Sequence, residues 1–174
     1  MKNCRHSVIR CILLAVAIAF TSSAKAQGDP TDSLPGDPGA IYVYTYQNLK
    51  FGAFTQGASG GTVVINTDGT RNVTGTVVAL NFGVTYFQAQ FDVEAAPGSL
   101  ISITNGPDAT LTGSNGGSIT LHIGSSDPGS PFNTTVSPPA TTRVNIGGTL
   151  TVGNISSAPP GAYSGSFSVT FNQE

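Results

Sequence analysis

The sequence predicts an all-β sandwich built from about eight to nine short antiparallel strands. Short runs of β-branched and aromatic residues alternate with polar residues at a period of two, which places successive side chains on opposite faces of a strand. Segments rich in glycine, proline, aspartate and asparagine separate these runs and are typical of turns. No window of helical length carries apolar residues three and four positions apart, so no amphipathic helix is predicted.

The clearest strand signal lies at the end of the chain, in residues 163–172. Apolar residues occupy one parity of this segment and polar residues occupy the other, which is typical of a strand with one buried and one wetted face. A terminal segment patterned so strongly is expected to pair within a sheet. The residues expected on its buried, strand-pairing side are Tyr163, Phe167, Val169 and Phe171, with Gly161 in the preceding turn.

Residues 41–46 predict the first strand of the domain. Ile41 and Val43 lie on one parity, whereas Tyr42, Tyr44 and Tyr46 lie on the other. Both faces are apolar or aromatic, which fits either a strand covered on both sides or an exposed strand that awaits a partner. Tyr44 is therefore grouped with Ile41 and Val43 as a candidate for strand pairing. The tyrosines are expected in the core or on a strand-pairing surface, and stacking on sugars is the alternative.

Several strands are expected between these two segments. Residues 62–66 and 73–80 are predicted to flank a tight turn at Asp68 and Gly69, because an Asp-Gly pair supplies the positive φ angles that such a turn needs. Residues 85–94 alternate cleanly between apolar and polar side chains. The residues expected to point inward from this strand are Phe87, Ala89, Phe91 and Val93.

The second half of the domain is expected to combine strands with long loops. Strands are predicted near residues 100–103 and 119–123, where apolar residues again alternate. Residues 105–117 and 124–140 are interpreted as loops, the second of them rich in serine, proline and glycine. The pair at residues 147–148, two glycines inside an apolar strand pattern, predicts a bulge or a tight corner.

The start of the chain predicts export. A basic beginning, an apolar run at residues 11–20 and small residues just before Gln27 are typical of a secretory signal peptide, here residues 1–26. The apolar run is too short to cross a bilayer, so no membrane span is expected in the mature chain. Residues 27–39, rich in proline, glycine and aspartate, predict a flexible linker, and residues 40–174 a single sandwich domain.

The predicted mature chain is acidic and free of cysteine. Lys50, Arg71 and Arg143 are its basic residues, and all nine acidic residues lie after the leader, which gives a net charge of 3 − 9 = −6. A chain without a basic footprint is a poor partner for nucleic acid. Cys4 and Cys11 fall within the leader, so the domain must be stable without a disulfide.

The residues suited to catalysis or metal binding are few. His122 is the single histidine of the mature chain, and its neighbours Leu121 and Ile123 are expected to point inward, so the imidazole is expected on the surface. With one histidine and no cysteine, neither a zinc site nor another metal or cofactor site is predicted. Asp92 and Glu94 share a strand face and are interpreted as a solvated pair rather than glycosidase carboxylates. No enzymatic activity is expected.

Several glycine-anchored strings stand in a fixed order along the domain. They comprise residues 49–54, 60–65, 68–71, 73–75, 144–152 and 161–171. Through these strings, over about residues 40–172, the chain resembles a bacterial family known as domain of unknown function 4402. The resemblance implies a secreted domain of Gram-negative bacteria with an immunoglobulin-like antiparallel β-sandwich, and it brings no assigned activity and no catalytic residues.

The end of the chain also resembles that of chaperone-usher pilins and of spore coat U-type domains. In those pilins the last strand carries alternating apolar residues, which a chaperone and a neighbouring subunit recognise, with a glycine upstream. Phe167, Val169 and Phe171, preceded by Gly161, match this pattern. Gln173 at the penultimate position and the missing disulfide depart from it.

These features predict a secreted, non-enzymatic structural or adhesive subunit that is pilin-like and assembled by β-strand addition. Its expected location is the periplasm or the outer surface of a Gram-negative bacterium. Its expected partners are other copies or related surface subunits and a periplasmic chaperone. Residues 41–46 either close their own sandwich or are donated to a neighbour. The alternative function is a stand-alone extracellular module that binds a glycan or a protein through its loops.

Overall fold

A computed structural model of the chain describes residues 39–174, and this part consists of strands joined by irregular segments. The predicted all-β class is therefore confirmed, whereas the predicted signal peptide and nearly all of the predicted linker lie outside the described residues. Bulges and corners divide several predicted strands, so the strand segments outnumber the eight to nine expected. In chain order they are β1 (Tyr42–Gln47), β2 (Lys50–Phe51), β3 (Ala53–Thr55), β4 (Gly61–Ile65), β5 (Arg71–Val73), β6 (Val78–Leu80), β7 (Tyr86–Phe87), β8 (Ala89–Glu94), β9 (Leu100–Asn105), β10 (Ala109–Gly113), β11 (Ser118–Asp127), β12 (Phe132–Asn133), β13 (Thr142–Val152), β14 (Tyr163–Ser164) and β15 (Val169–Gln173).

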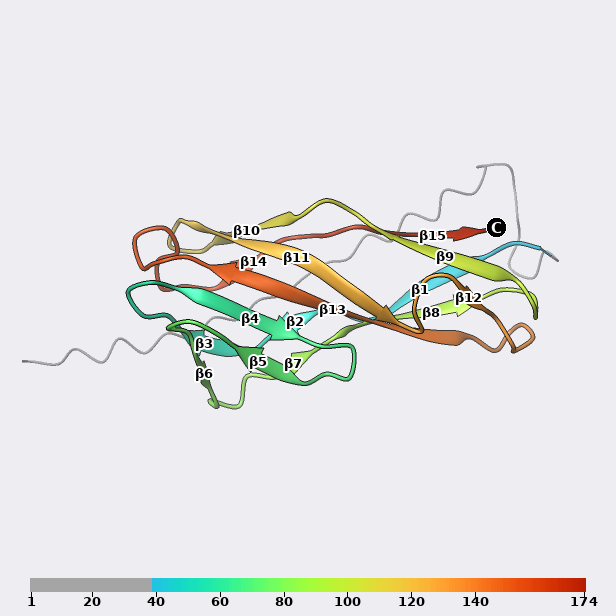
Figure 1. Ribbon diagram of the computed structural model, residues 1–174, viewed down its shortest axis with the longest axis horizontal. Coiled ribbons are helices and arrows are strands. Elements are labelled where there is room, and N and C mark those ends of the chain that lie inside the picture. Colours follow the sequence, from blue (N-terminus) through green and yellow to red (C-terminus); the bar gives the residue numbers. More distant parts are fainter. Residues whose placement is uncertain (1–38) are drawn as a thin grey trace, which may run out of the picture.

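The main sheet contains eight strands, in the order β1-β8-β13-β11-β10-β14, with β4 also paired to β13 and β5 paired to β4. Its pairings are antiparallel. The long strand β13 lies at the centre of the sheet (Figure 1). One edge of β13 pairs with β11, whereas the other edge pairs first with β8 and then with β4. Strand β13 thereby joins β11 on one side to β8 and β4 on the other.

A second sheet of three strands, in the order β12-β9-β15, supplies the opposing layer. Figure 1 shows β9 and β15 side by side along one flank of the molecule. The rings of Phe91 on β8 and Phe171 on β15 lie 5.5 Å apart between centroids, so the two layers share one core. Buried apolar residues from both layers fill this core, which accounts for a stable domain without disulfides.

Two small ribbons, β2 with β7 and β3 with β6, extend the sandwich beyond the main sheet. The guanidinium of Arg71 on β5 joins both of them to the main sheet. It donates hydrogen bonds to the carbonyls of Phe51 and Ala53 at 3.1 Å and of Leu80 at 3.4 Å. It also stacks on the ring of Tyr86, 4.3 Å from the centroid. A planar group with five donors suits this position between three carbonyls.

Two of the places where the chain passes from one sheet to the other, after β9 and after β14, are adjacent. The crossing segments lie side by side, since the Gly106 N–H donates to the Ser168 carbonyl at 2.9 Å. The prediction of one continuous strand over residues 163–172 was therefore wrong, because β14 belongs to the main sheet and β15 to the second. The predicted parity is nevertheless confirmed, and the buried residues are Tyr163, Phe167, Val169 and Phe171.

The glycine pair inside β13 marks the point where β13 exchanges β8 for β4 as its partner. β13 itself runs without interruption, and the predicted bulge lies in β11, where Gly124 and Ser125 oppose Gly147 alone. A Cβ atom on Gly147 would lie 2.5 Å from the Ile65 carbonyl oxygen. A Cβ atom on Gly148 would lie 2.8 Å from the Leu49 side chain. Close packing against β13 thus explains both glycines.

Both segments interpreted as loops contain strands. Residues 105–117 include β10, whose buried Leu111 packs in the core. Within residues 124–140, β11 continues to Asp127 and β12 pairs with β9. Phe132 and Thr134 are buried there, and the Thr134 hydroxyl donates to a main-chain carbonyl at 2.5 Å. The loop interpretation failed because one apolar side chain and one satisfied hydroxyl suffice to anchor a segment rich in proline and glycine.

The first predicted hairpin is confirmed, but its returning strand is shorter than expected. β4 and β5 pair antiparallel around Gly69, whose φ is +81°. The Asp68 carboxylate accepts hydrogen bonds from the Thr70 hydroxyl and N–H, and these contacts lower the pKa of Asp68. Residues 73–80 do not form one strand, because β5 ends at Val73 and β6 begins a separate ribbon. Phe87, expected to point inward, is 38% exposed in the ribbon with β2.

Replacing Gly147 with Ala should lower the free energy of unfolding by about 1–3 kcal/mol, because the added methyl group collides with the β4 carbonyl across the sheet. Gly129→Ala is the matched control, since a Cβ atom there meets nothing within 4 Å. It should change stability by less than about 1 kcal/mol. Urea denaturation of the two variants measures both values, and equal stabilities would contradict the proposed packing constraint.

Candidate functional site

The last strand, β15, lies at the edge of the second sheet. Its register with β9 runs from Val169 opposite Asn105 to Gln173 opposite Ile101. No other strand in the described part of the chain pairs with β15. One side of this strand is therefore open to a further strand, which is the geometry that strand addition requires.

The hydrogen-bonding pattern shows which main-chain groups face outward. The Gly106 N–H donates to the Ser168 carbonyl, and the Glu174 N–H donates to the Leu100 carbonyl at 3.0 Å. Bonded and non-bonded pairs alternate in an antiparallel ladder, so the even-numbered residues of β15 face β9. The main-chain N–H and C=O groups of the odd-numbered residues point away from β9. These residues are Val169, Phe171 and Gln173.

The side chains of β15 serve the sandwich rather than the open edge. Val169 and Phe171 are buried, and Phe171 contacts Phe91 across the core. Thr170 is half-buried and Asn172 exposed on the opposite face. The edge thus presents main-chain donors and acceptors on a strand that is already held in place by its own apolar face.

Tyr163 fixes the short strand β14 at the far end of the main sheet. Its buried hydroxyl donates to the Pro159 carbonyl at 2.5 Å, and burial raises the pKa of Tyr163. A Cβ atom on Gly113 would lie 2.7 Å from this ring, so a larger residue there would displace it. Gly161 lies in the turn before β14, where a Cβ atom would approach the Ser114 hydroxyl to 2.8 Å.

The first strand, β1, pairs with β8 of its own chain, from Tyr42 opposite Glu94 to Gln47 opposite Gln90. In this structure residues 41–46 therefore close their own sandwich. Ile41 and Val43 are half-buried against the core, whereas Tyr44 is 48% exposed. The candidate residues consequently occupy three places, namely β1, β14 with its turn, and β15 with the crossing before it.

An exposed side-chain cluster lies on the outer face of β1, β8 and β13. Tyr44, Asp92 and Arg143 stand opposite one another on these three strands. The Arg143 guanidinium binds both carboxylate oxygens of Asp92, at 2.8 and 3.0 Å, and this bond raises the pKa of Arg143. The same guanidinium lies 3.6 Å from the centroid of the Tyr46 ring. Asp92 is thus tied to Arg143 and is not paired with Glu94.

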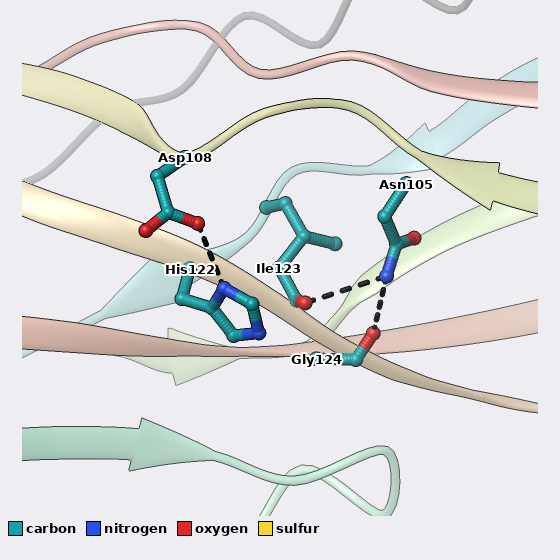
Figure 2. A network of polar contacts seen from close by, with 5 residues as sticks. All are labelled: Asn105, Asp108, His122, Ile123 and Gly124. Carbon is teal, nitrogen blue, oxygen red and sulfur yellow. Dashed lines mark hydrogen bonds and ion pairs between the residues drawn. The ribbon is translucent and has the colours of Figure 1, made fainter.

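His122 points outward from β11, as predicted, and lies beside Asp108 (Figure 2). Its Nδ1 atom is 2.7 Å from the Asp108 carboxylate, and the two side chains are 68% and 56% exposed. Asn105 anchors the adjacent end of β9 by donating to the carbonyls of Ile123 and Gly124 at 3.3 and 2.8 Å. These contacts join the second sheet to the bulged part of β11.

A shallow hollow of about 240 Å³ lies where the two crossing segments meet. Its walls include Asp108 from the first crossing and Ser166 and Ser168 from the second, above the buried Phe167. Among residues 39–174, no three histidine, cysteine, aspartate or glutamate side chains gather as metal ligands. Within the same range, no helix is long and apolar enough to cross a membrane.

Sequence reasoning identified the buried parity of the last strand but not the cluster around Arg143. Nothing in the sequence joins Tyr46, Asp92 and Arg143, which lie on three strands far apart in the chain. The open edge of β15 is visible only in the structure, because the outward main-chain groups of this strand are defined by its register with β9.

Comparison with known proteins gives one match. A family model described as Domain of unknown function (DUF4402) matches residues 41–172. No curated protein matches the chain, and no solved structure does. The matched range includes β1 and all but the last residue of β15, so both terminal strands are part of the family domain.

Tyr163 should make stability fall at alkaline pH. Burial raises its pKa in the folded state, so the unfolded state loses this proton first and stability declines as pH rises from about 10. Tyr163→Phe should flatten this decline and, by losing the bond to Pro159, cost about 1 kcal/mol at pH 7. Tyr44→Phe at an exposed position is the control and should retain the decline. Unfolding titrations between pH 7 and 11 measure it, and identical slopes in Tyr163→Phe and the wild type would contradict the assignment.

Proposed function

The chain belongs to the DUF4402 family, and we propose that it is a secreted, non-enzymatic structural or adhesive subunit of the cell surface, assembled by β-strand addition. The observation that supports this proposal is the open edge of β15. Three consecutive odd-numbered residues direct main-chain donors and acceptors away from β9. An added strand would pair with all of these groups.

The composition of β15 favours this role. Edge strands in soluble proteins are usually blocked by charged side chains, prolines or bulges, which prevent unwanted pairing. β15 has the sequence Val-Thr-Phe-Asn-Gln, without a charge or a proline, and its register with β9 is unbroken. An unprotected edge of this kind is suited to an intended partner strand.

The proposed partners are other copies of this chain or related surface subunits, with a periplasmic chaperone that covers the edge before assembly. A joint made of main-chain hydrogen bonds does not depend on charge, which suits a domain with few charged residues. The proposed site of this assembly is the periplasm or the outer surface of a Gram-negative bacterium, and the sequence features typical of export support it. Because β1 pairs within its own domain here, donation of β1 would require its release from β8.

A second candidate function is a stand-alone extracellular module that binds a glycan or a protein. The observation that favours it is the exposed cluster of Tyr44, Tyr46, Asp92 and Arg143 on the outer face of the main sheet. Binding by this face and pairing by the β15 edge use different groups of the molecule. The two functions can therefore be tested separately.

Gln173→Pro should block assembly without unfolding the domain. Proline removes an N–H group that points away from β9, and proline is tolerated in edge strands where its missing N–H would have faced outward. In a surface fraction of the native host, the wild type should give a ladder of bands that collapses to one band after boiling in detergent. The variant should reduce the ladder by roughly tenfold, as expected from the loss of about one main-chain bond and a steric block.

Gln173→Ala is the matched control, because it removes the same side chain but retains the N–H group. It should assemble as the wild type does, and both variants should keep the wild-type unfolding temperature. A wild-type chain that gives one band near the mature mass with and without boiling would refute assembly by strand addition. A full ladder from Gln173→Pro would show that the joint does not use the edge of β15.

A further inference from the structure

We propose that the outer face around Tyr46 and Arg143 is a binding site for a neutral glycan. Tyr46 is 61% exposed although the Arg143 guanidinium covers one face of its ring. The accessible surface must therefore include the other face of the ring. Sugar rings bind proteins by laying their C–H groups on such a face while their hydroxyl groups bond to polar side chains around it.

The side chains of the site are held by contacts within the domain. Arg143 is held by two charge-assisted bonds to Asp92, and this pair spans β8 and β13. The guanidinium in turn orients Tyr46, which lies at the register shift of β1. An aromatic ring that is already held in place loses little conformational entropy when it binds, so even a small contact area can give measurable affinity.

Polar groups suited to sugar hydroxyls lie on the neighbouring strands β8 and β13. Gln90 and Asn145 lie opposite each other on β8 and β13, and the Gln90 amide donates to the Asn145 side-chain oxygen at 2.8 Å. The remaining donor and acceptor positions of both amides are available on the half-buried surface. Tyr44, which stands opposite Asp92, offers a second exposed ring on the outer face. Two exposed rings beside these polar groups suit an oligosaccharide.

The charges of the site favour a neutral ligand. Arg143 is neutralised by Asp92, and Glu94 stands beside them on the same face of β8. This arrangement repels anionic glycans, as does the net charge of the predicted mature chain, 3 − 9 = −6. A quaternary ammonium ligand would need the ring face that the guanidinium occupies or a cage of several rings.

The exposed apolar area on this face is too small for a protein partner. Stable protein interfaces bury about 800 Å² on each side around an apolar centre. The exposed large apolar residues on the described outer face of β1, β8 and β13 are Tyr44 and Tyr46, which are separated by polar side chains. Two rings with a polar surround match a sugar better than they match a protein surface.

The test uses the monomeric full-length mature chain and a panel of neutral hexaoses from cello-, laminari-, malto-, manno- and chito-series. Saturation-transfer NMR and calorimetry should detect saturable binding of at least one of them. Tyr46→Ala should weaken that binding by about tenfold or more, because the stacking surface is lost. Arg143→Lys keeps the charge but loses the planar, bidentate contact, and should weaken it by roughly threefold to tenfold.

Phe82→Ala is the matched control, since Phe82 is an aromatic residue of similar exposure in the segment after β6. It should leave glycan binding unchanged, and circular dichroism should show all three variants folded. The proposal is overturned if no neutral hexaose binds, if Tyr46→Ala binds as the wild type does, or if only charged glycans bind. Because this site does not involve β15, a monomer that binds sugar but never polymerises would refute strand addition and retain the glycan site.

Discussion

The arrangement of the whole domain depends on the pairing of one strand, β13. It bonds to β11 from Asn145 to Thr151, and on its other edge it exchanges β8 for β4 at Gly147 and Gly148. The lack of side chains there lets the Ile65 carbonyl and the Leu49 side chain approach the strand closely. If β13 were displaced, β4 and β8 would lose their common partner, and the core between the two sheets would open.

The two crossing segments determine where β15, the proposed pairing strand, lies in the second sheet. The chain leaves the second sheet after β9, enters the main sheet as β10, and repeats the path in reverse from β14 to β15. Since the two crossings bond to each other at Gly106 and Ser168, β15 can lie only beside β9. Among the described residues, no other strand pairs with the far side of β15. The open edge thus follows from the pairing of the described strands.

The sequence predicted features that depend on local periodicity and missed those that depend on distant contacts. The buried parity of Phe167, Val169 and Phe171 is visible as alternation, and the structure confirms it. The division of that segment between two sheets is not visible, because the alternation continues across the crossing. Phe132 was missed because one buried ring among prolines and glycines forms no periodic pattern. The stacking of Arg143 on Tyr46 was missed because it joins strands that meet only after folding.

The two proposed surfaces use different chemistry, and this difference bears on how one small domain can serve both. Strand addition uses main-chain groups of β15, whose positions are fixed by the ladder with β9 and vary little with side-chain identity. The proposed glycan binding uses side chains on the outer face of β1, β8 and β13. These three strands contribute to the core only through the side chains of their opposite face. Substitutions on the outer face can therefore alter the ligand without altering the joint. In such a subunit, the side chains of the binding face can change while the main-chain edge used for assembly stays the same.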